Sequence, residues 1–321
     1  MKSSIFRPLS LILAIQVGFP ALGEAAYSGT SSFSFLNIPM GARAAAMGQA
    51  FGSVPNDIQG LSYNPASLAT MAASQVSLEH LTYVQDVDQE AMAFGHAGRR
   101  EEFSWGLSTD YLRVGDITRT IANDPTAPGD GFTEEGSFST YDLAMGASLA
   151  GPVTEDLSIG TTLKLLRESL ADASSNAGAV DLGLIYQAND ERSWNVGASV
   201  ENLGFASKFA DAAVQLPLAL RAGVSGQPFA QWLLTSDYVQ RVDTGGEVDV
   251  GAEVTPRKFF SLRMGYRYTL TGSDLGGFSN FSMGIGFRTG MMSLDYAFVP
   301  LGDLGLTHRI SLNFRFKTHR D

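Results

Sequence analysis

The strongest constraint on the fold is a sustained alternation of apolar and polar residues that begins at Ala73 and continues to the C-terminus. Side chains at positions i and i+2 lie on the same face of a β-strand, so a period of two predicts strands with one apolar and one polar face. The run Phe281, Met283, Ile285 and Phe287 is a clear example. Because turn residues interrupt the alternation repeatedly, the pattern predicts many antiparallel strands.

Fourteen segments show this alternation, and we expect them to form an all-β fold, a transmembrane antiparallel barrel over residues 73–321. They start near residues 74, 88, 101, 137, 157, 177, 192, 215, 230, 246, 259, 278, 290 and 306. An even number of strands is what a bacterial outer-membrane barrel requires. If the N-terminus is periplasmic, the long connections near 114–136, 169–176, 202–214 and 270–277 all face outward, as such barrels prefer.

A soluble β-sandwich also alternates between an inner and an outer face, so it is the main alternative. Two observations argue against it. Polar and charged residues fill the faces opposite the apolar ones, and a sandwich core would not tolerate so many buried ions. Aromatic residues also stand near the ends of the strands, where barrels place interfacial girdles. These residues are Tyr83, Trp105, Tyr111, Trp194, Trp232, Tyr238, Tyr268 and Tyr296.

The first 25 residues have the order of a secretory signal peptide. Basic Lys2 and Arg7 precede an apolar run from Leu9 to Phe19, and small residues follow as far as Ala25, after which we expect cleavage. The apolar run is too short for a membrane-spanning helix, which needs roughly 20 residues. The chain has no Cys, so a lipoprotein anchor is excluded. An exported barrel indicates the outer membrane of a Gram-negative cell, with outer-membrane lipids around it.

Residues 26–72, between the signal peptide and the first strand, do not alternate. We interpret them as a hatch or plug segment with two short helices. Ala residues at 42, 44, 45, 46 and 50 favour a helix with little side-chain bulk. Asn64 can cap a second helix that starts at Pro65, because the N–H that proline lacks would be unpaired at that position in any case.

Both ends of the chain resemble the PorV/PorQ family of outer-membrane proteins. At the N-terminal end the resemblance rests on the sequence 41–51, on Asp57 and on the sequence 63–69, and the wider FadL-like transporters share the Asn64-Pro65-Ala66 element. At the other end it rests on the sequences 262–267, 284–288, 294–305 and 307–316. The resemblance implies a fourteen-stranded barrel with its N-terminal segment in or under the lumen. It also implies a role, in some bacteria, in type IX secretion, where the barrel receives secreted cargo proteins.

Six residues of the hatch are candidates for a gating element, in which a shift of a short helix would open or close the lumen. For the Asn-Pro-Ala element the alternative is a fixed cap. For the Met-Gly pair it is ordinary packing, and the aspartate is either a cap or an ion-pair partner in the lumen. The candidates are Met47, Gly48, Asp57, Asn64, Pro65 and Ala66.

The alternation also predicts which charged residues point into the lumen. The basic set comes from strands eleven, twelve and fourteen: Arg263, Arg267, Arg288, Arg309 and Arg315. The acidic set comes mainly from strands four to ten, with one further aspartate on strand thirteen: Asp142, Asp181, Glu201, Asp237, Asp249, Glu253 and Asp295. We expect a basic wall opposite an acidic one, with a transverse field or with ion pairs where strands ten and eleven meet. The alternative is that the charges simply pair and stiffen a plugged barrel.

The composition favours a protein that is not an enzyme. The formal net charge of −11 disfavours a nucleic-acid partner. The four His residues show no metal-ligand spacing and no catalytic motif is present, so we expect no metal and no cofactor. Two functions remain: docking of secreted cargo proteins or secretion-system subunits in a type IX-like system, and a FadL-like gated channel for small or hydrophobic molecules. A purely structural barrel is a third possibility.

Overall fold

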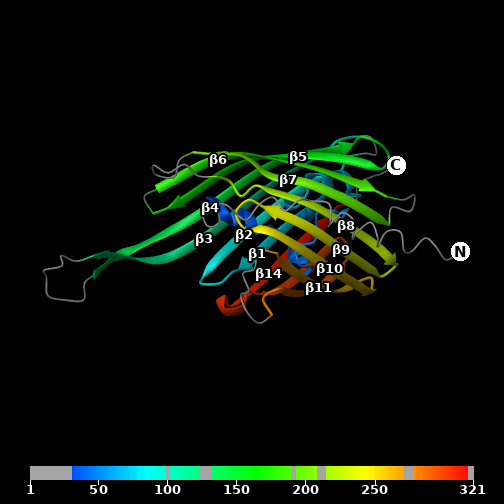
Figure 1. Ribbon diagram of the computed structural model, residues 1–321. Coiled ribbons are helices and arrows are strands. Elements are labelled where there is room, and N and C mark those ends of the chain that lie inside the picture. Colours follow the sequence, from blue (N-terminus) through cyan, green and yellow to red (C-terminus); the bar gives the residue numbers. More distant parts are fainter. Residues whose placement is uncertain are drawn as a thin grey trace.

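Fourteen antiparallel strands form one closed barrel (Figure 1), which confirms the predicted fold. The computed structural model describes residues 31–98, 102–122, 132–171, 173–188, 193–207, 215–270 and 278–316. The predicted signal peptide, residues 1–25, lies outside the described residues. Each strand pairs with its neighbours along the chain, and β1 pairs with β14 to close the barrel.

The strands start close to the predicted positions. The strands are β1 (Gln75–Thr82), β2 (Val87–His96), β3 (Ser104–Ala122), β4 (Phe132–Pro152), β5 (Leu157–Leu170), β6 (Ala173–Gln187), β7 (Trp194–Ala206), β8 (Ala219–Phe229), β9 (Trp232–Arg241), β10 (Gly245–Arg257), β11 (Phe260–Thr269), β12 (Phe281–Thr289), β13 (Met292–Pro300) and β14 (Leu306–Arg315). A single turn, η4 (Gly302–Leu304), precedes β14. The predicted starts of β5 and β14 coincide with the observed ones.

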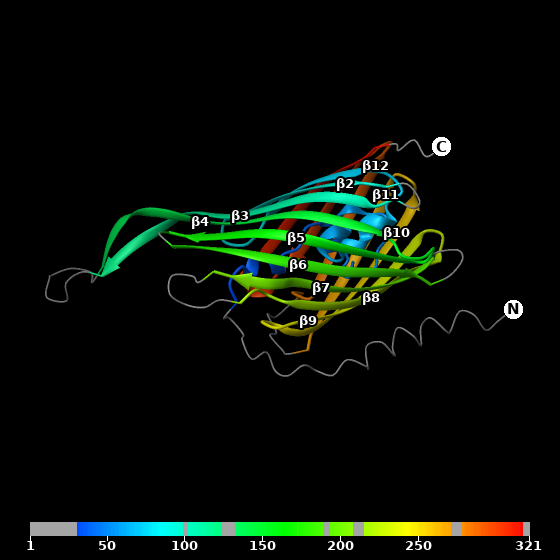
Figure 2. The same ribbon diagram turned by 90° about the horizontal axis from the view of Figure 1, so that it is seen from above.

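The long connection expected at residues 114–136 is wrong for most of its length. β3 continues to Ala122 and β4 begins at Phe132, so the two strands form a ribbon that projects well beyond the other strands (Figures 1 and 2). Cross-strand pairs such as Ile121 with Thr133 continue the ladder there, and residues of this kind favour extended backbone. Two register shifts interrupt the ribbon. Strand also replaces most of the connection expected at 169–176 and the start of the one expected at 202–214.

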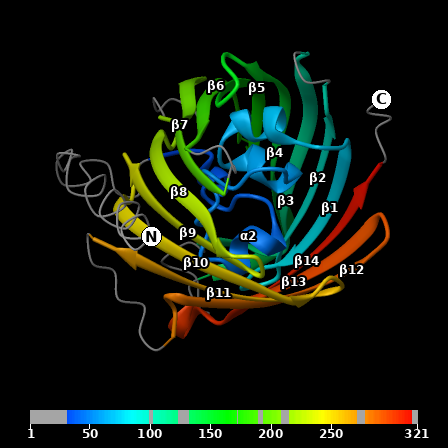
Figure 3. The ribbon, with the colours of Figure 1, turned by 90° about the vertical axis from the view of Figure 1, so that its right-hand side faces the viewer.

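Residues 31–72 occupy the lumen, as the view along the barrel shows (Figure 3). We call them the plug. The plug contains η1 (Ser34–Asn37), α2 (Ala42–Ala46), η2 (Ile58–Ser62) and η3 (Pro65–Thr70). The expectation of two short helices is therefore corrected: the alanine-rich stretch forms one short α-helix, and the other three elements are 3₁₀ turns. α2 ends early because Gly48 and Gln49 both have left-handed backbone, with φ of 66° and 65°.

The outer face of the barrel is apolar. Leu163, Leu165 and Met264 expose 62, 72 and 62 % of their surface, which is what a lipid-facing band requires. Trp105 and Tyr268, two of the expected girdle residues, are also exposed, whereas Tyr238 is buried. Within the described residues, no helix has the length and apolar character needed to cross a membrane.

Candidate functional site

Glycines on the inner face of the barrel lie where the plug backbone comes closest. A Cβ added at Gly160 would lie 2.5 Å from the carbonyl carbon of Pro65, and one at Gly265 would lie 2.0 Å from the amide nitrogen of Gly48. Real side chains do not approach so closely, and a glycine within a strand marks such close contact between backbones. The inner wall is therefore shaped to the backbone of the plug.

Asn64 connects the plug to the wall. Its Oδ1 accepts a hydrogen bond from the amide of Ala66 at 3.0 Å, so Asn64 caps η3 and Pro65 is the first residue of that turn, as the sequence predicted. Its Nδ2 donates to the carbonyl oxygens of Gly52 at 2.8 Å and Leu184 at 2.9 Å. The side chain of Asn64 is fully buried. One amide thus fixes the cap, a second plug segment and strand β6 together.

The Met47-Gly48 pair follows α2. Met47 is fully buried and packs in a cluster with Phe51 and Tyr63. The amide of Gly48 donates to Ser282 Oγ at 3.0 Å, and its left-handed backbone turns the chain against β10 and β11. Both residues lie in a tight turn between the helix and the wall.

Asp57 is both a cap and an ion-pair partner. Its Oδ1 accepts from the amide of Gln59 at 3.0 Å at the start of η2, and its Oδ2 lies 2.7 Å from Arg43 Nη1. Arg43 also donates two hydrogen bonds to the carboxylate of Glu253, at 2.8 and 2.7 Å. Burial alone would lower the pKa of Arg43, but Glu253 and Asp57 together raise it above its ordinary value. The guanidinium therefore stays charged and ties the plug to β10.

The network continues into the wall. Arg263 on β11 donates to Glu253 at 2.6 Å and to Asp295 on β13 at 2.7 Å. Asn313 Nδ2 on β14 donates a hydrogen bond to the other carboxylate oxygen of Asp295, at 2.8 Å. A chain of buried charges thus runs from Arg43 in the plug across β10, β11 and β13.

A second network surrounds Arg221 on β8. Arg221 donates to Glu201 at 2.9 Å and to Asp237 at 3.2 Å, and its Nη1 lies 3.8 Å from Asp249. The amides of Phe51 and Gly52 donate to the same oxygen of Asp237, at 3.0 and 2.8 Å. On the other side of Asp249, Arg267 Nε lies 3.6 Å away. The carboxylate of Asp237 therefore holds the plug backbone as well as the arginine.

A third contact lies where β1 and β14 close the barrel. Glu79 on β1 accepts hydrogen bonds from the plug amide of Gly41 and from Ser311 on β14, both at 2.7 Å. Arg309 on β14 lies 3.3 Å from the other oxygen of Glu79 and donates to the carbonyl oxygen of Pro39. Both strands of the closure are thus bonded to the plug.

The expected division into a basic wall and an acidic wall is wrong. Arg221 and Arg241 point inward among the carboxylates, while Asp295 and Glu79 lie among the arginines. The charges alternate because an unpaired charge in a buried lumen is costly, so the buried Arg221, Arg241, Arg263 and Arg309 each lie beside a carboxylate. Where β10 and β11 meet, Glu253 stands opposite Arg263 in the register, as Asp249 stands opposite Arg267.

The remaining predicted lumen residues lie outside these networks. Arg288 is exposed at the end of β12, and Arg315 donates to the carbonyl oxygen of Asn56 at 3.0 Å. Asp142 is half-buried, and Asp181 pairs with Lys164 at 2.6 Å. The structure thus brings the predicted residues into several separate groups.

Sequence reasoning missed Arg43, Glu79 and Arg221 as site residues. The alternation carried the signal for the last two, since Glu79 and Arg221 share the inner face with the buried residues two positions away. No such signal exists for Arg43, because its partner Glu253 is 210 residues away and only the fold brings them together.

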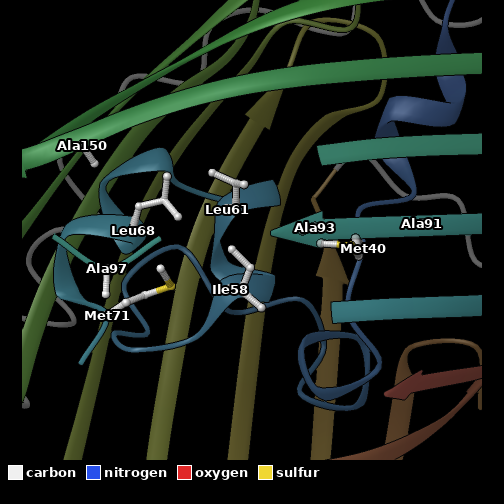
Figure 4. Close-up of a cluster of buried hydrophobic side chains, with 9 residues drawn as sticks. All are labelled: Met40, Ile58, Leu61, Leu68, Met71, Ala91, Ala93, Ala97 and Ala150. Atoms are coloured by element: carbon white, nitrogen blue, oxygen red, sulfur yellow. The ribbon is translucent and has the colours of Figure 1, made fainter. Parts of the chain in front are cut away.

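Another side of the plug is apolar. Met40, Ile58, Leu61, Leu68 and Met71 pack against small wall residues of β2 and β4 and the residue after β2 (Figure 4), and the wall residues are Ala91, Ala93, Ala97 and Ala150. Beside this cluster lies a cavity of about 60 Å³ between the plug and β2–β5, with Asp110 and Lys164 on its wall. We call this the apolar side, and the side that carries the Arg43 and Arg221 networks the charged side. Among the described residues, no group of three or more His, Asp or Glu side chains could hold a metal ion.

The sequence matches one known protein family. Residues 22–204 match the model of an uncharacterised protein family, UPF0164. The chain belongs to this family. No curated protein matches the sequence of this UPF0164 member. The narrower resemblance to PorV/PorQ proteins stays a prediction.

Solved structures with the same fold include two structures of TodX and one of a FadL homologue. The TodX monoaromatic hydrocarbon channel ΔS2 mutant matches with a TM-score of 0.59 at 12 % identity, over 87 % of this chain and 99 % of that one. The Pseudomonas putida toluene transporter TodX matches at 0.52 and 14 % identity, over 90 and 97 %. A Pseudomonas aeruginosa FadL homologue matches at 0.55 and 12 % identity, over 91 and 99 %. At such identities the likeness concerns the fold, which is that of FadL-like outer-membrane barrels. The two TodX structures are described as a monoaromatic hydrocarbon channel and a toluene transporter.

Proposed function

We propose that this protein is an outer-membrane channel for small, largely apolar molecules, and that the plug closes it in the state described above. The observation that carries the proposal is that the two sides of the plug contact the wall in different ways. Buried ion pairs fix one side, while the other side has apolar contacts and a cavity next to the wall. The fold shared with hydrocarbon channels supports the same proposal.

The gating role assigned to Met47, Gly48, Asp57, Asn64, Pro65 and Ala66 is part of this proposal. All six are buried, and they contact the charged side or β5 and β6. We therefore propose that they act as the fixed hinge of the gate. The part that yields is the apolar side, since it carries no ion pair among the contacts shown in Figure 4.

A direct test is planar-bilayer conductance of the full protein beside a variant that lacks residues 27–70. We expect steady conductance only from the truncated barrel, because the plug fills the lumen. Heat-modifiable migration on a semi-native gel checks that the truncated barrel is folded. Uptake of labelled toluene by a Gram-negative host that lacks its own hydrocarbon channels then tests transport. A folded, truncated barrel that does not conduct, or a full protein that gives no uptake, contradicts the proposal.

A second proposal is that the protein docks secreted cargo proteins or secretion-system subunits at the cell surface, as in type IX-like secretion. The observation that favours it is the ribbon of β3 and β4, whose residues 132–137 are all exposed. Replacement of residues 115–139 by a short turn would separate the two proposals. Under docking, the amount of secreted protein on the cell surface falls and toluene uptake does not change. Under transport alone, surface protein is unaffected.

A further inference from the structure

The cavity on the apolar side carries one carboxylate whose charge has no ion-pair partner within the described residues. Asp110 on β3 lines the cavity, and its two oxygens accept hydrogen bonds from a single group, Gln89 Nε2, at 2.7 and 2.8 Å. That same amide also donates to the carbonyl oxygen of Ile38 at 3.0 Å. Two carboxylate oxygens have room for about four hydrogen bonds in all. Asp110 therefore has unused acceptor capacity beside a cavity.

The other charged residue at the cavity, Lys164, forms its ion pair with another carboxylate. Lys164 Nζ lies 2.6 Å from Asp181 Oδ2 and donates to Asn202 Oδ1 at 2.9 Å. Its charge is thus matched by Asp181, on the side away from Asp110. Of these two aspartates, Asp110 is the one without an ion-pair partner in the part of the chain that the structure describes.

The rest of the cavity is apolar or carries a small hydroxyl. Leu36, Met40 and Leu61 of the plug face Ala144 and Ser108 of the wall. A pocket of this kind, mostly apolar with one placed polar group, selects its ligand by that group.

We infer that this cavity is the binding site of the channel for small apolar molecules that carry a hydrogen-bond donor, a hydroxyl or an ammonium, with Asp110 as the acceptor. The inference rests on the proposed transport function and narrows its substrate class. Bare hydrocarbons gain nothing from Asp110, because they bring no donor to its free acceptor positions. Anionic molecules such as fatty acids are disfavoured, since their carboxylate would lie close to the carboxylate of Asp110.

The size of the cavity adds a condition. An apolar cavity of about 150 Å³ binds benzene in another protein, whereas this one measures about 60 Å³. A ring therefore enters only if Leu36 and Met40 give way. Leu36 is half-buried, whereas Met40 is buried. We expect Met40→Ala to strengthen binding of every ring-shaped probe, whatever its polar group.

The test is titration calorimetry of the purified full-length protein with benzylamine, phenol, toluene and benzoate. Wild-type protein should bind benzylamine and phenol more tightly than toluene, and benzoate most weakly. In Asp110→Asn, benzylamine should bind about tenfold more weakly relative to toluene, as loss of a hydrogen bond to a charged group implies. Phenol should weaken less, because the amide oxygen still accepts. This difference between the amine and the hydroxyl shows which donor the site prefers.

Asp142→Asn is the matched control. Asp142 lies on the same wall and points inward from β4, but it does not line the cavity and is half-buried. It should leave all four affinities unchanged. An unchanged ratio of benzylamine to toluene binding in Asp110→Asn overturns the inference even if toluene is transported. If the wild type neither binds nor takes up any of the probes, the proposed function itself is wrong.

Discussion

The charged and apolar sides of the plug are held by different forces. On the charged side, carboxylates and guanidiniums of Arg43, Glu253 and Arg263 meet at 2.6–2.8 Å in fixed geometry. On the apolar side, Leu68 and Met71 contact alanines of the wall without hydrogen bonds between the side chains. Buried ion pairs are strongly directional, whereas apolar contacts tolerate some repacking. The difference shows how one plug can be held in a fixed position and still move. Ion pairs on the charged side hold it, and the contacts on the apolar side can repack.

The largest effect should come from a side chain forced between wall and plug. In Gly183→Val, a Cβ would stand 2.0 Å from Asn64 Oδ1, so the plug cannot seat and the barrel either conducts or fails to fold. Heat-modifiable migration and bilayer conductance distinguish these results. Gly178→Val on the same strand is the control, because a Cβ there meets nothing within 4 Å. Closed, folded Gly183→Val protein would show that the plug adapts and that the two sides are not distinct.

Loss of the plug arginine should come next. Arg43→Gln leaves Asp57 and Glu253 without their shared cation, and breaking a buried ion pair costs about 3–5 kcal/mol. The plug should open often, which single-channel recording would show as frequent transitions to the conductance of the truncated barrel. Arg43→Lys keeps the charge and should open less often. If single-channel recordings of Arg43→Gln and of the wild type both show a channel that stays closed, the ion pairs do not hold the plug.

A cavity made on the apolar side should have a smaller effect. Leu68→Ala removes a fully buried side chain, at a cost of about 2–4 kcal/mol. Urea unfolding in detergent measures the loss of stability. Because this side is proposed to yield, toluene uptake should rise while the closed state without ligand persists. Leu165→Ala, on the lipid face and 72 % exposed, should alter neither quantity. A fall in uptake would contradict the assignment of the yielding face.

The smallest effect is expected from Met47→Leu. The two side chains have similar volumes, so the change should cost less than about 1.5 kcal/mol and leave conductance unaltered. This result would support ordinary packing for Met47. A marked rise in conductance would instead assign Met47 a specific role in the gate.

The alternation of residues was sufficient to predict the barrel, because the inner and outer faces of a strand repeat every two positions. It also placed Asp249, Glu253, Arg263 and Arg309 on the inner face, where they are buried. It failed for the ribbon of β3 and β4, since both faces there meet solvent and no face needs to be apolar. The cap at Asn64 was predictable because capping is local. The partners of Arg43 were not, because ion pairs between distant segments depend on the finished fold.

The contacts of Glu79 have a consequence for how the barrel stays closed. One carboxylate oxygen of Glu79 on β1 accepts hydrogen bonds from two donors. One is the amide of Gly41 in the plug, just before α2, and the other is the hydroxyl of Ser311 on β14, the strand that pairs with β1. β1 and β14 pair directly with each other, and the plug adds hydrogen bonds to both strands from the lumen side. The segment that seals the pore therefore also helps to hold the two ends of the wall together, and a barrel with its plug seated should resist opening at this seam better than the truncated barrel does.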